Sequence, residues 1–236
     1  MVRHRWLVCV SVPVLVGIGV SSGSAAKLGT VTSSGLLSVS QAASTGSPSV
    51  LGCDDFTAAT GASISGRAAT VATACASRSW IVHVGTWTIQ TNAAASSATT
   101  DAVATENTAT VNSTATAVIT NLNTGGRSGG LVLSHNGTST YLAAVMIDAP
   151  TDRIELRLYT AGVSSLLATY NPTFATTNTL QLSRNAAVVT TTLNGATAGT
   201  FTLTSAQLTT LATGARAGLF GGNASVRYDD FVVTAP

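Results

Sequence analysis

Short runs in which apolar and polar residues alternate recur along most of the chain. The clearest run is 153–159, where Ile154, Leu156 and Leu158 fall on one side and charged or polar residues separate them. A period of two is typical of a β-strand with one buried face. Further strand-like runs lie at 79–84, 86–90, 115–120, 131–135, 141–147, 180–182, 188–193, 201–203, 217–220 and 226–233.

Turn signals separate these runs. Asn136-Gly137 and Asn194-Gly195 each follow an apolar run, and this dipeptide favours the tight turn of a β-hairpin. Segment 205–211 departs from the pattern, because Leu208 and Leu211 are spaced as on a single helical turn. Many short strands without a long helix predict an all-β, antiparallel two-sheet sandwich with one short helical turn near 205–211.

The N-terminal segment has the pattern of a secretory signal peptide. Basic residues at 3–5 precede an apolar run at 6–20, and small residues follow at 22–26. We expect a signal peptide at 1–26 and a secreted protein. A membrane-spanning helix needs about 20 apolar residues, so the shorter run favours cleavage over retention as an anchor, and we expect no stable membrane insertion after cleavage.

The remainder divides into a leader and a domain. Segment 27–52 is rich in Ser, Gly and Thr and has no sustained periodicity, which predicts a flexible leader. Residues 53–236 carry the strand pattern and number about 180, enough for one hydrophobic core.

Charge excludes one class of partner. The chain has 11 basic and nine acidic side chains, and removal of Arg3 and Arg5 with the signal leaves it neutral. Nucleic-acid binding needs a basic surface, so we expect none. Only 8% of residues are charged, yet 45% are hydrophobic, which argues against disorder.

Two cysteines remain after signal cleavage. Cys9 lies in the signal, while Cys53 and Cys75 lie in the exported part. An oxidising compartment favours a disulfide between them, which would stabilise the fold by about 3 kcal/mol. Two free buried thiols are the alternative.

The tripeptide Asp-Asp-Phe occurs at both ends of the strand-like region, as 54–56 and 229–231. These copies hold four of the nine acidic residues. The repeat suggests that the first and last strands lie together, with Phe56 and Phe231 in the core.

Five elements in this order resemble the concanavalin A-like lectin and glucanase superfamily, and within it the laminin-G-like jelly roll of secreted, actinobacterial-type proteins. The elements are the Asp-Asp-Phe opening, Trp80 followed by the segment 85–89, the hairpin from 130 to Tyr141, the strand and turn at 189–195, and the segment 217–220 before the second Asp-Asp-Phe. The likeness covers 53–234 and implies a fold without implying one function.

The resemblance brings the two tripeptides side by side. Four carboxylates at one edge repel one another unless they are neutralised. A structural Ca²⁺ ion held by Asp54, Asp55, Asp229 and Asp230 is one solution, since calcium prefers oxygen ligands. The alternative is that these aspartates cap turns or pair with Arg67 or Arg227.

The sequence contains no clear catalytic motif. Glycosidases of this superfamily use paired carboxylates in a Glu-x-Asp-x-x-Glu strand, and glycosidic cleavage needs two such groups on one surface. The two glutamates, Glu106 and Glu155, are not in that motif. Asp148 and Asp152 flank a turn near Glu155, where acidic residues are common for turn chemistry alone.

Binding is the better supported class of function. Sugar sites combine aromatic rings with a few polar side chains. The candidates are His135, Asn136, Tyr141, Arg157 and Tyr159, which we expect on one outward face of neighbouring strands. We therefore predict a secreted, non-catalytic module that binds a polysaccharide or cell-envelope glycan, or that serves in adhesion or envelope structure. A divergent glycoside hydrolase or lyase and a subunit of an extracellular surface assembly are the alternatives.

Overall fold

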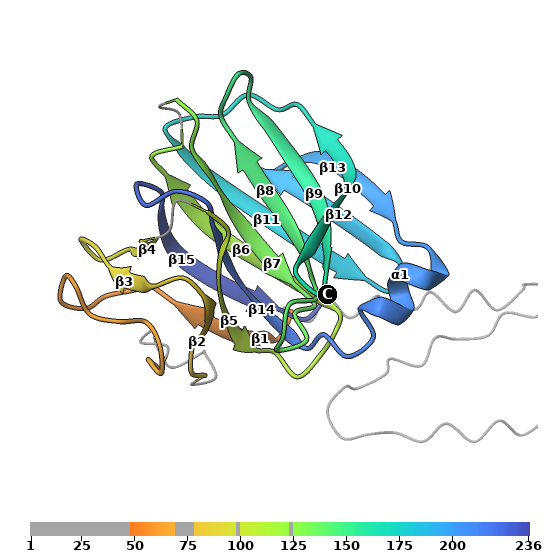
Figure 1. The fold of residues 1–236 in the computed structure, drawn as a ribbon, viewed down its shortest axis with the longest axis horizontal. Helices are drawn as coiled ribbons and strands as arrows, with labels where there is room; N and C mark the ends of the chain where they lie inside the picture. Colours follow the sequence, from red (N-terminus) through yellow and green to blue (C-terminus); the bar gives the residue numbers. More distant parts are fainter. Residues whose placement is uncertain (1–47, 69–77, 98–99, 123–124) are drawn as a thin grey trace, which may run out of the picture. The chain divides into compact units, whose positions relative to one another are not determined.

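The alternating runs form strands of two antiparallel sheets that pack face to face (Figure 1). The computed structural model describes residues 48–68, 78–97, 100–122 and 125–236. The predicted signal peptide and nearly all of the predicted leader lie outside these residues. The expected domain boundary at Cys53 falls within the first strand.

One sheet has eight strands. Their order is β13 (Ala196–Thr202), β12 (Val188–Leu193), β11 (Thr177–Asn185), β6 (Ser113–Thr120), β15 (Arg227–Thr234), β4 (Ala94–Ser96) and β3 (Trp87–Ile89), with β1 (Val50–Asp54) also paired to β15.

The other sheet has seven strands. Their order is β10 (Val163–Tyr170), β9 (Arg153–Thr160), β8 (Tyr141–Ile147), β7 (Ser128–Leu133), β14 (Arg216–Gly221), β5 (Ala102–Asn107) and β2 (Ile81–Val84). The predicted all-β, jelly-roll type of sandwich is therefore confirmed.

The predicted helical turn is also confirmed, as α1 (Ser205–Thr210). Thr204 caps its N-terminus by accepting a hydrogen bond from the backbone N–H of Gln207, whose side chain bonds back to the Thr204 N–H. This reciprocal pair satisfies two donors that a helix start leaves open. In the described part of the chain, no helix has the length and apolar character needed to cross a membrane.

The main core lies between the sheets. Strand β9 shows how the alternation builds it, because Ile154, Leu156 and Leu158 are buried against the opposite sheet as predicted. The intervening residues point to the outer face of the seven-stranded sheet. A second apolar cluster covers that outer face, and it includes Val132, Tyr141, Tyr159 and Phe220.

The first and last strands pair, as the repeated tripeptide suggested. Strand β1 runs antiparallel to β15, with Asp54 opposite Phe231. Phe56 and Phe231 are fully buried, and each packs on Trp80, with ring centroids 5.6 and 5.1 Å from it. We call this β1–β15 junction the seam.

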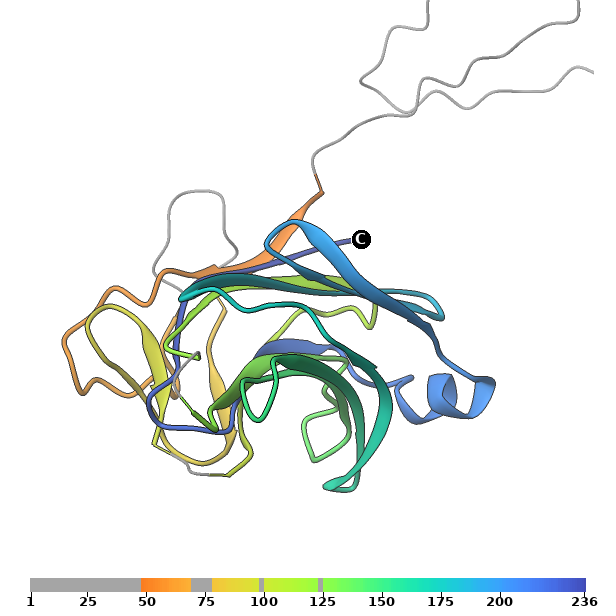
Figure 2. The ribbon, with the colours of Figure 1, turned by 90° about the horizontal axis from the view of Figure 1, so that it is seen from above.

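The seven-stranded sheet is strongly curved. Figure 2 shows it as an arch whose hollow side faces away from the eight-stranded sheet. We call this hollow side the concave face. It carries the second apolar cluster and the candidate site.

Candidate functional site

Four stacked rings lie in a row on the concave face. His83 stacks on His135 with ring centroids 4.0 Å apart, and His135 stacks on Tyr141 at 5.1 Å. Tyr141 and Tyr159 follow at 4.4 Å, with an angle of 13° between their rings. The rings come from β2, the connection after β7, β8 and β9, so the row draws together distant strands of the sheet.

Register and small neighbours allow this row to form. Tyr141 and Tyr159 are direct partners in β8 and β9, so their side chains share one face. The next outward position of β8 is Ala143, and Gly218 occupies the middle of β14. A Cβ added to Gly218 would lie 2.0 Å from the Ala104 carbonyl oxygen. Ala143 therefore leaves room for the rings on the concave face, which Val132 and Phe220 also line.

A β-bulge brings His83 to the row. The register between β2 and β5 shifts between Val82 and Val84, and such an extra residue re-aims a side chain. The Nε2 atom of His83 lies 2.8 Å from the Thr105 hydroxyl, within hydrogen-bond distance. That contact holds the imidazole over the concave face.

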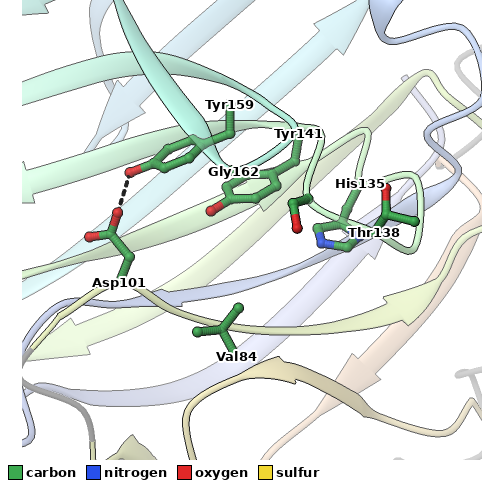
Figure 3. Close-up of a pocket in the computed structure, with 8 residues that line it drawn as sticks. Val84, Asp101, His135, Thr138, Tyr141, Tyr159 and Gly162 are labelled. Atoms are coloured by element: carbon green, nitrogen blue, oxygen red, sulfur yellow. Dashed lines mark hydrogen bonds between the residues drawn. The ribbon is translucent and has the colours of Figure 1, made fainter.

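A cavity of about 170 Å³ lies beside the rings (Figure 3). Tyr159 donates a hydrogen bond of 2.8 Å from its hydroxyl to Oδ2 of Asp101 at one side of this cavity, as Figure 3 shows. The residues that line the cavity are Val84, Asp101, His135, Thr138, Ser139, Tyr141, Tyr159 and Gly162.

The rings cover one another. Tyr141 is 5% exposed and Tyr159 is 2% exposed. The site therefore offers ring edges and polar atoms rather than an open stacking platform.

Both tyrosine hydroxyls stay protonated. Burial raises the pKa of Tyr159 to about 12, and Asp101 adds to the rise while Arg157 opposes it. Burial raises the pKa of Tyr141 further, with Tyr159 and Asp101 contributing. Each phenol is thus a neutral hydrogen-bond donor at physiological pH.

His135 is neutral and its tautomer is fixed. Burial lowers its pKa to about 3, with smaller contributions from His83 and Arg216. Its Nδ1 atom accepts a hydrogen bond of 2.9 Å from the backbone N–H of Gly137. The ring proton is therefore assigned to Nε2, and that buried Nε2 has no hydrogen-bond partner.

Charged residues of β9 continue the concave face. Glu155 accepts hydrogen bonds from Arg153 at 2.8 Å and from Arg157 at 2.6 Å. Burial would raise the pKa of Glu155, but the hydrogen bonds from the two arginines outweigh it and leave the pKa below its ordinary value. Arg157 lies two residues before Tyr159 on the same strand, so it borders the ring row.

Asn136 has a local structural contact. Its Oδ1 atom accepts hydrogen bonds from the backbone N–H groups of Thr138 and Thr140 and from the Thr138 hydroxyl. These bonds shape the connection between β7 and β8, which supplies Thr138 and Ser139 to the cavity.

Three of the five predicted ligand residues thus line the cavity: His135, Tyr141 and Tyr159. Arg157 lies next to them, and Asn136 shapes the adjoining connection. Sequence reasoning missed His83 and Asp101, which reach the rings because of a bulge and of the curvature of the sheet. Neither feature leaves a signal in the alternation of apolar and polar residues.

The seam aspartates have different environments. Asp54 is fully buried, and its carboxylate accepts hydrogen bonds from Trp80 Nε1 at 2.8 Å and from the Phe56 N–H at 2.8 Å. Arg67 donates to both oxygens of Asp54, each at 3.2 Å. The expected alternative of pairing with Arg67 therefore holds for Asp54.

The other three seam aspartates serve turns or face solvent. Asp55 accepts a hydrogen bond from the Thr57 N–H at 3.0 Å, and Asp229 accepts one from the Asp230 N–H at 2.9 Å. Burial raises the pKa of Asp229, and the charges of Asp230, Asp55 and Asp54 add to the rise. The seam carboxylates therefore repel one another, as the sequence suggested.

These residues do not form a ready calcium site. The Asp54 carboxylate is already occupied by Arg67, Trp80 and the backbone. Within the described ranges, no group of three or more His, Cys, Asp or Glu side chains is arranged to hold a metal ion. Calcium at the seam stays a prediction, and the geometry favours ion pairing and capping instead.

The predicted disulfide stays a prediction as well. Cys53 is buried in β1, at 3% exposure, whereas Cys75 lies outside the described residues. A disulfide from Cys53 would tie the segment after β1 to the seam.

Three of the acidic residues considered for catalysis accept hydrogen bonds from the protein. Asp148 accepts a hydrogen bond of 2.6 Å from the Arg127 N–H, and Asp152 accepts one of 2.7 Å from the Phe174 N–H. Glu155 is held by two arginines. The second carboxylate oxygen of Asp148, Oδ2, is buried without a hydrogen-bond partner.

Comparisons with known proteins give structural similarities alone. No family model matches the chain, and no curated protein matches it. Among solved structures, the carbohydrate-binding module CBM66 from Bacillus subtilis is 15% identical, with a TM-score of 0.47, over 66% of this chain and 90% of that one. The GH43 BlXynB protein from Bacillus licheniformis is 14% identical, with a TM-score of 0.42, over 67% of this chain and 33% of that one, so the match spans a third of its length. The Caenorhabditis elegans galectin LEC-6 is 13% identical, with a TM-score of 0.39, over 52% of this chain and 82% of that one.

Proposed function

We propose that the protein is a secreted, non-catalytic carbohydrate-binding module whose ligand enters the cavity on the concave face. One observation carries the proposal: the cavity brings an apolar wall, aromatic edges, hydroxyl groups and a carboxylate together. A sugar presents both C–H surface and hydroxyl groups, and binding sites for such ligands combine apolar contact with a few polar groups.

Each part of the cavity has a matching role. Asp101 uses Oδ2 to accept the Tyr159 bond, and its other oxygen can accept a bond from a sugar hydroxyl. Thr138 and Ser139 add hydroxyls that donate or accept, and Val84 gives a contact for C–H groups. The cavity, of about 170 Å³, holds part of a polysaccharide rather than a long stretch of it.

Binding of the full chain to a panel of immobilised polysaccharides tests this function. We expect at least one polysaccharide to retain the protein, and Asp101→Asn to weaken that retention at least tenfold. Asp101 is exposed, and asparagine keeps an oxygen that can accept the Tyr159 bond, so we expect the variant to fold; thermal unfolding checks this. Asp152→Asn is the matched control, because Asp152 is acidic but does not line the cavity.

Two results would contradict the proposal. Failure of every polysaccharide to retain the protein would leave an adhesive or structural role. Equal retention of the Asp101→Asn variant and the wild-type protein would place the sugar elsewhere on the molecule.

The proposal of secretion depends on segment 1–26, whose sequence has the pattern of a signal peptide. N-terminal sequencing of protein recovered from the culture medium tests it. A mature chain that begins at Lys27 supports cleavage, and protein retained in membranes with its N-terminus intact supports an anchor.

A subunit role in an extracellular assembly is the second candidate, and β10 favours it. This edge strand has no charged residue and leaves Val163 71% and Leu166 60% exposed. Exposed, uncharged edge strands can pair with a strand of another chain. Oligomers that appear with rising concentration in sedimentation, and that Leu166→Lys dissociates, would support this role. A monomer at all concentrations would contradict it.

A further inference from the structure

Arg216 differs from the other arginines of the described residues. Each of the others donates a hydrogen bond to a carboxylate, hydroxyl or carbonyl oxygen. Arg216 makes no such bond and no ion pair among these residues, and its Nη1 atom is buried without a partner. A buried, charged N–H group without an acceptor is costly, so this cation requires an explanation.

His135, which like Arg216 lies beside Gly137, adds a second unpartnered donor in this part of the concave face. Its Nε2 carries the ring proton and is also buried without an acceptor. Both side chains lie near Gly137: the Gly137 N–H donates to His135 Nδ1 at 2.9 Å, and a Cβ added to Gly137 would lie 3.8 Å from Arg216 Nε. The backbone N–H of His135 also donates a hydrogen bond of 3.1 Å to the backbone carbonyl oxygen of Arg216, which ties the two strands' ends together.

The charge of this part of the concave face is positive. Burial, assisted by the positive charge of Arg216, lowers the pKa of His83, and the same causes act on His135 together with His83. Both imidazoles are therefore neutral, while the guanidinium keeps its charge. Arg216 and His135 thus offer N–H donors, and neither is paired with a carboxylate. Such donors suit an oxyanion, because arginine and other N–H groups bind carboxylates and sulfates through charge-assisted hydrogen bonds.

This part of the concave face adjoins the sugar cavity. His135 lines that cavity, and Thr138 and Ser139 of the same connection also line it. Gly137 is exposed and carries no side chain, so it leaves the approach to the guanidinium uncrowded. A sugar ring in the cavity could therefore direct an acidic substituent toward Arg216.

We infer that Arg216 and His135 form an oxyanion site, and that the ligand of the concave face is an acidic polysaccharide whose carboxylate or sulfate group binds there. The sugar part of this inference rests on the proposed function. The oxyanion site itself can be tested without any sugar.

The first experiment titrates the full chain with inorganic sulfate and follows the His135 ring signals by NMR. We expect saturable shifts in the wild-type protein, at least a tenfold loss of affinity in Arg216→Gln, and a smaller loss in Arg216→Lys, which keeps the charge. Arg227→Gln is the control, because Arg227 lies in the other sheet and donates to backbone carbonyls. Thermal unfolding of each variant checks that it is folded.

The second experiment compares acidic ligands with their neutral forms. Oligogalacturonate is paired with its methyl ester, and a sulfated galactan is paired with its desulfated form. We expect at least one acidic form to bind tenfold or more tightly than its neutral partner, and the Arg216→Gln substitution to remove that preference. The pair that shows the preference identifies carboxylate or sulfate as the natural group.

The outcomes separate this inference from the proposed function. Equal binding of acidic and neutral sugars, unchanged in Arg216→Gln, overturns the inference and leaves sugar binding in place. Sulfate binding that Arg216→Gln abolishes, with no sugar bound in either form, supports the oxyanion site and overturns the sugar function. Absence of sulfate shifts in the wild-type protein and in Arg216→Lys, with both folded, overturns the oxyanion site.

Discussion

The Tyr159 hydroxyl donates a 2.8 Å hydrogen bond to Asp101, which lies directly before β5, although three strands separate β9 from β5 in the sheet. Strands are spaced about 4.8 Å apart, so a flat sheet would hold the two backbones about 19 Å apart. A tyrosine side chain cannot span that distance. The bond therefore requires the arch seen in Figure 2 and links its two sides.

Removal of this bond should loosen the arch. We expect Tyr159→Phe to lower the free energy of unfolding by about 1 kcal/mol, the usual value for one hydrogen bond, as measured by urea denaturation. Tyr170→Phe is a matched control, because the Tyr170 hydroxyl is buried without a partner and its loss should cost nothing. Equal losses in the two variants would show that the Asp101 bond contributes nothing specific.

The fold was more predictable than the site. Alternation in 153–159 assigned the two faces of β9 correctly, and the repeated Asp-Asp-Phe correctly paired the first and last strands. Strands β4, β5 and β10 were missed because their Ala, Ser and Thr residues give a weak contrast between faces, and most of β1 was assigned to the leader. The contacts of His83 and Asp101 were missed because alternation shows which face a residue occupies but not how a sheet bulges or curves.

Asp54 should be the most important aspartate of the seam. Asp54→Asn removes the charge that Arg67 and Trp80 bind, and breaking a buried ion pair costs about 3 kcal/mol or more. Denaturant unfolding should show this loss. Asp230→Asn, at an exposed position of the second tripeptide, should change stability by less than about 0.5 kcal/mol. Similar losses in both would contradict the distinction between a buried, paired carboxylate and an exposed one.

Calcium should have little effect on the seam as it lies in this structure. We expect the melting temperature to be the same in millimolar calcium and in a chelator, because the Asp54 carboxylate is already occupied. Magnesium serves as the control ion. A rise with calcium alone, lost in Asp229→Asn, would instead support the calcium site suggested by the resemblance.

Glu106 should make stability depend on pH. Both of its carboxyl oxygens are buried without a hydrogen-bond partner. Burial raises its pKa to about 8, with Asp54 adding to the rise and Arg78 opposing it. Between about pH 4.5 and 8 the unfolded chain releases this proton while the folded chain keeps it, so stability should fall as the pH rises.

Glu106→Gln should remove that fall, because the amide cannot ionise. Unfolding measured at several pH values between 5 and 8 tests this expectation. Glu155→Gln is the control: the pKa of Glu155 is lowered, so its effect should lie on the acidic side, below about pH 4.5. A slope that persists unchanged in Glu106→Gln would assign it to another group.

The seam also predicts that the chain can begin and end at another point without a change of fold. Beyond the β1–β15 pairing, the Ala235 N–H donates to the Ser49 carbonyl oxygen at 2.9 Å, so the two ends of the described domain touch. Adjacent ends and exposed turns are the conditions under which circular permutation succeeds. A gene that joins Pro236 to Pro48 through a short linker and opens at the exposed Asn194-Gly195 turn should still encode the same sandwich, with the concave face unchanged.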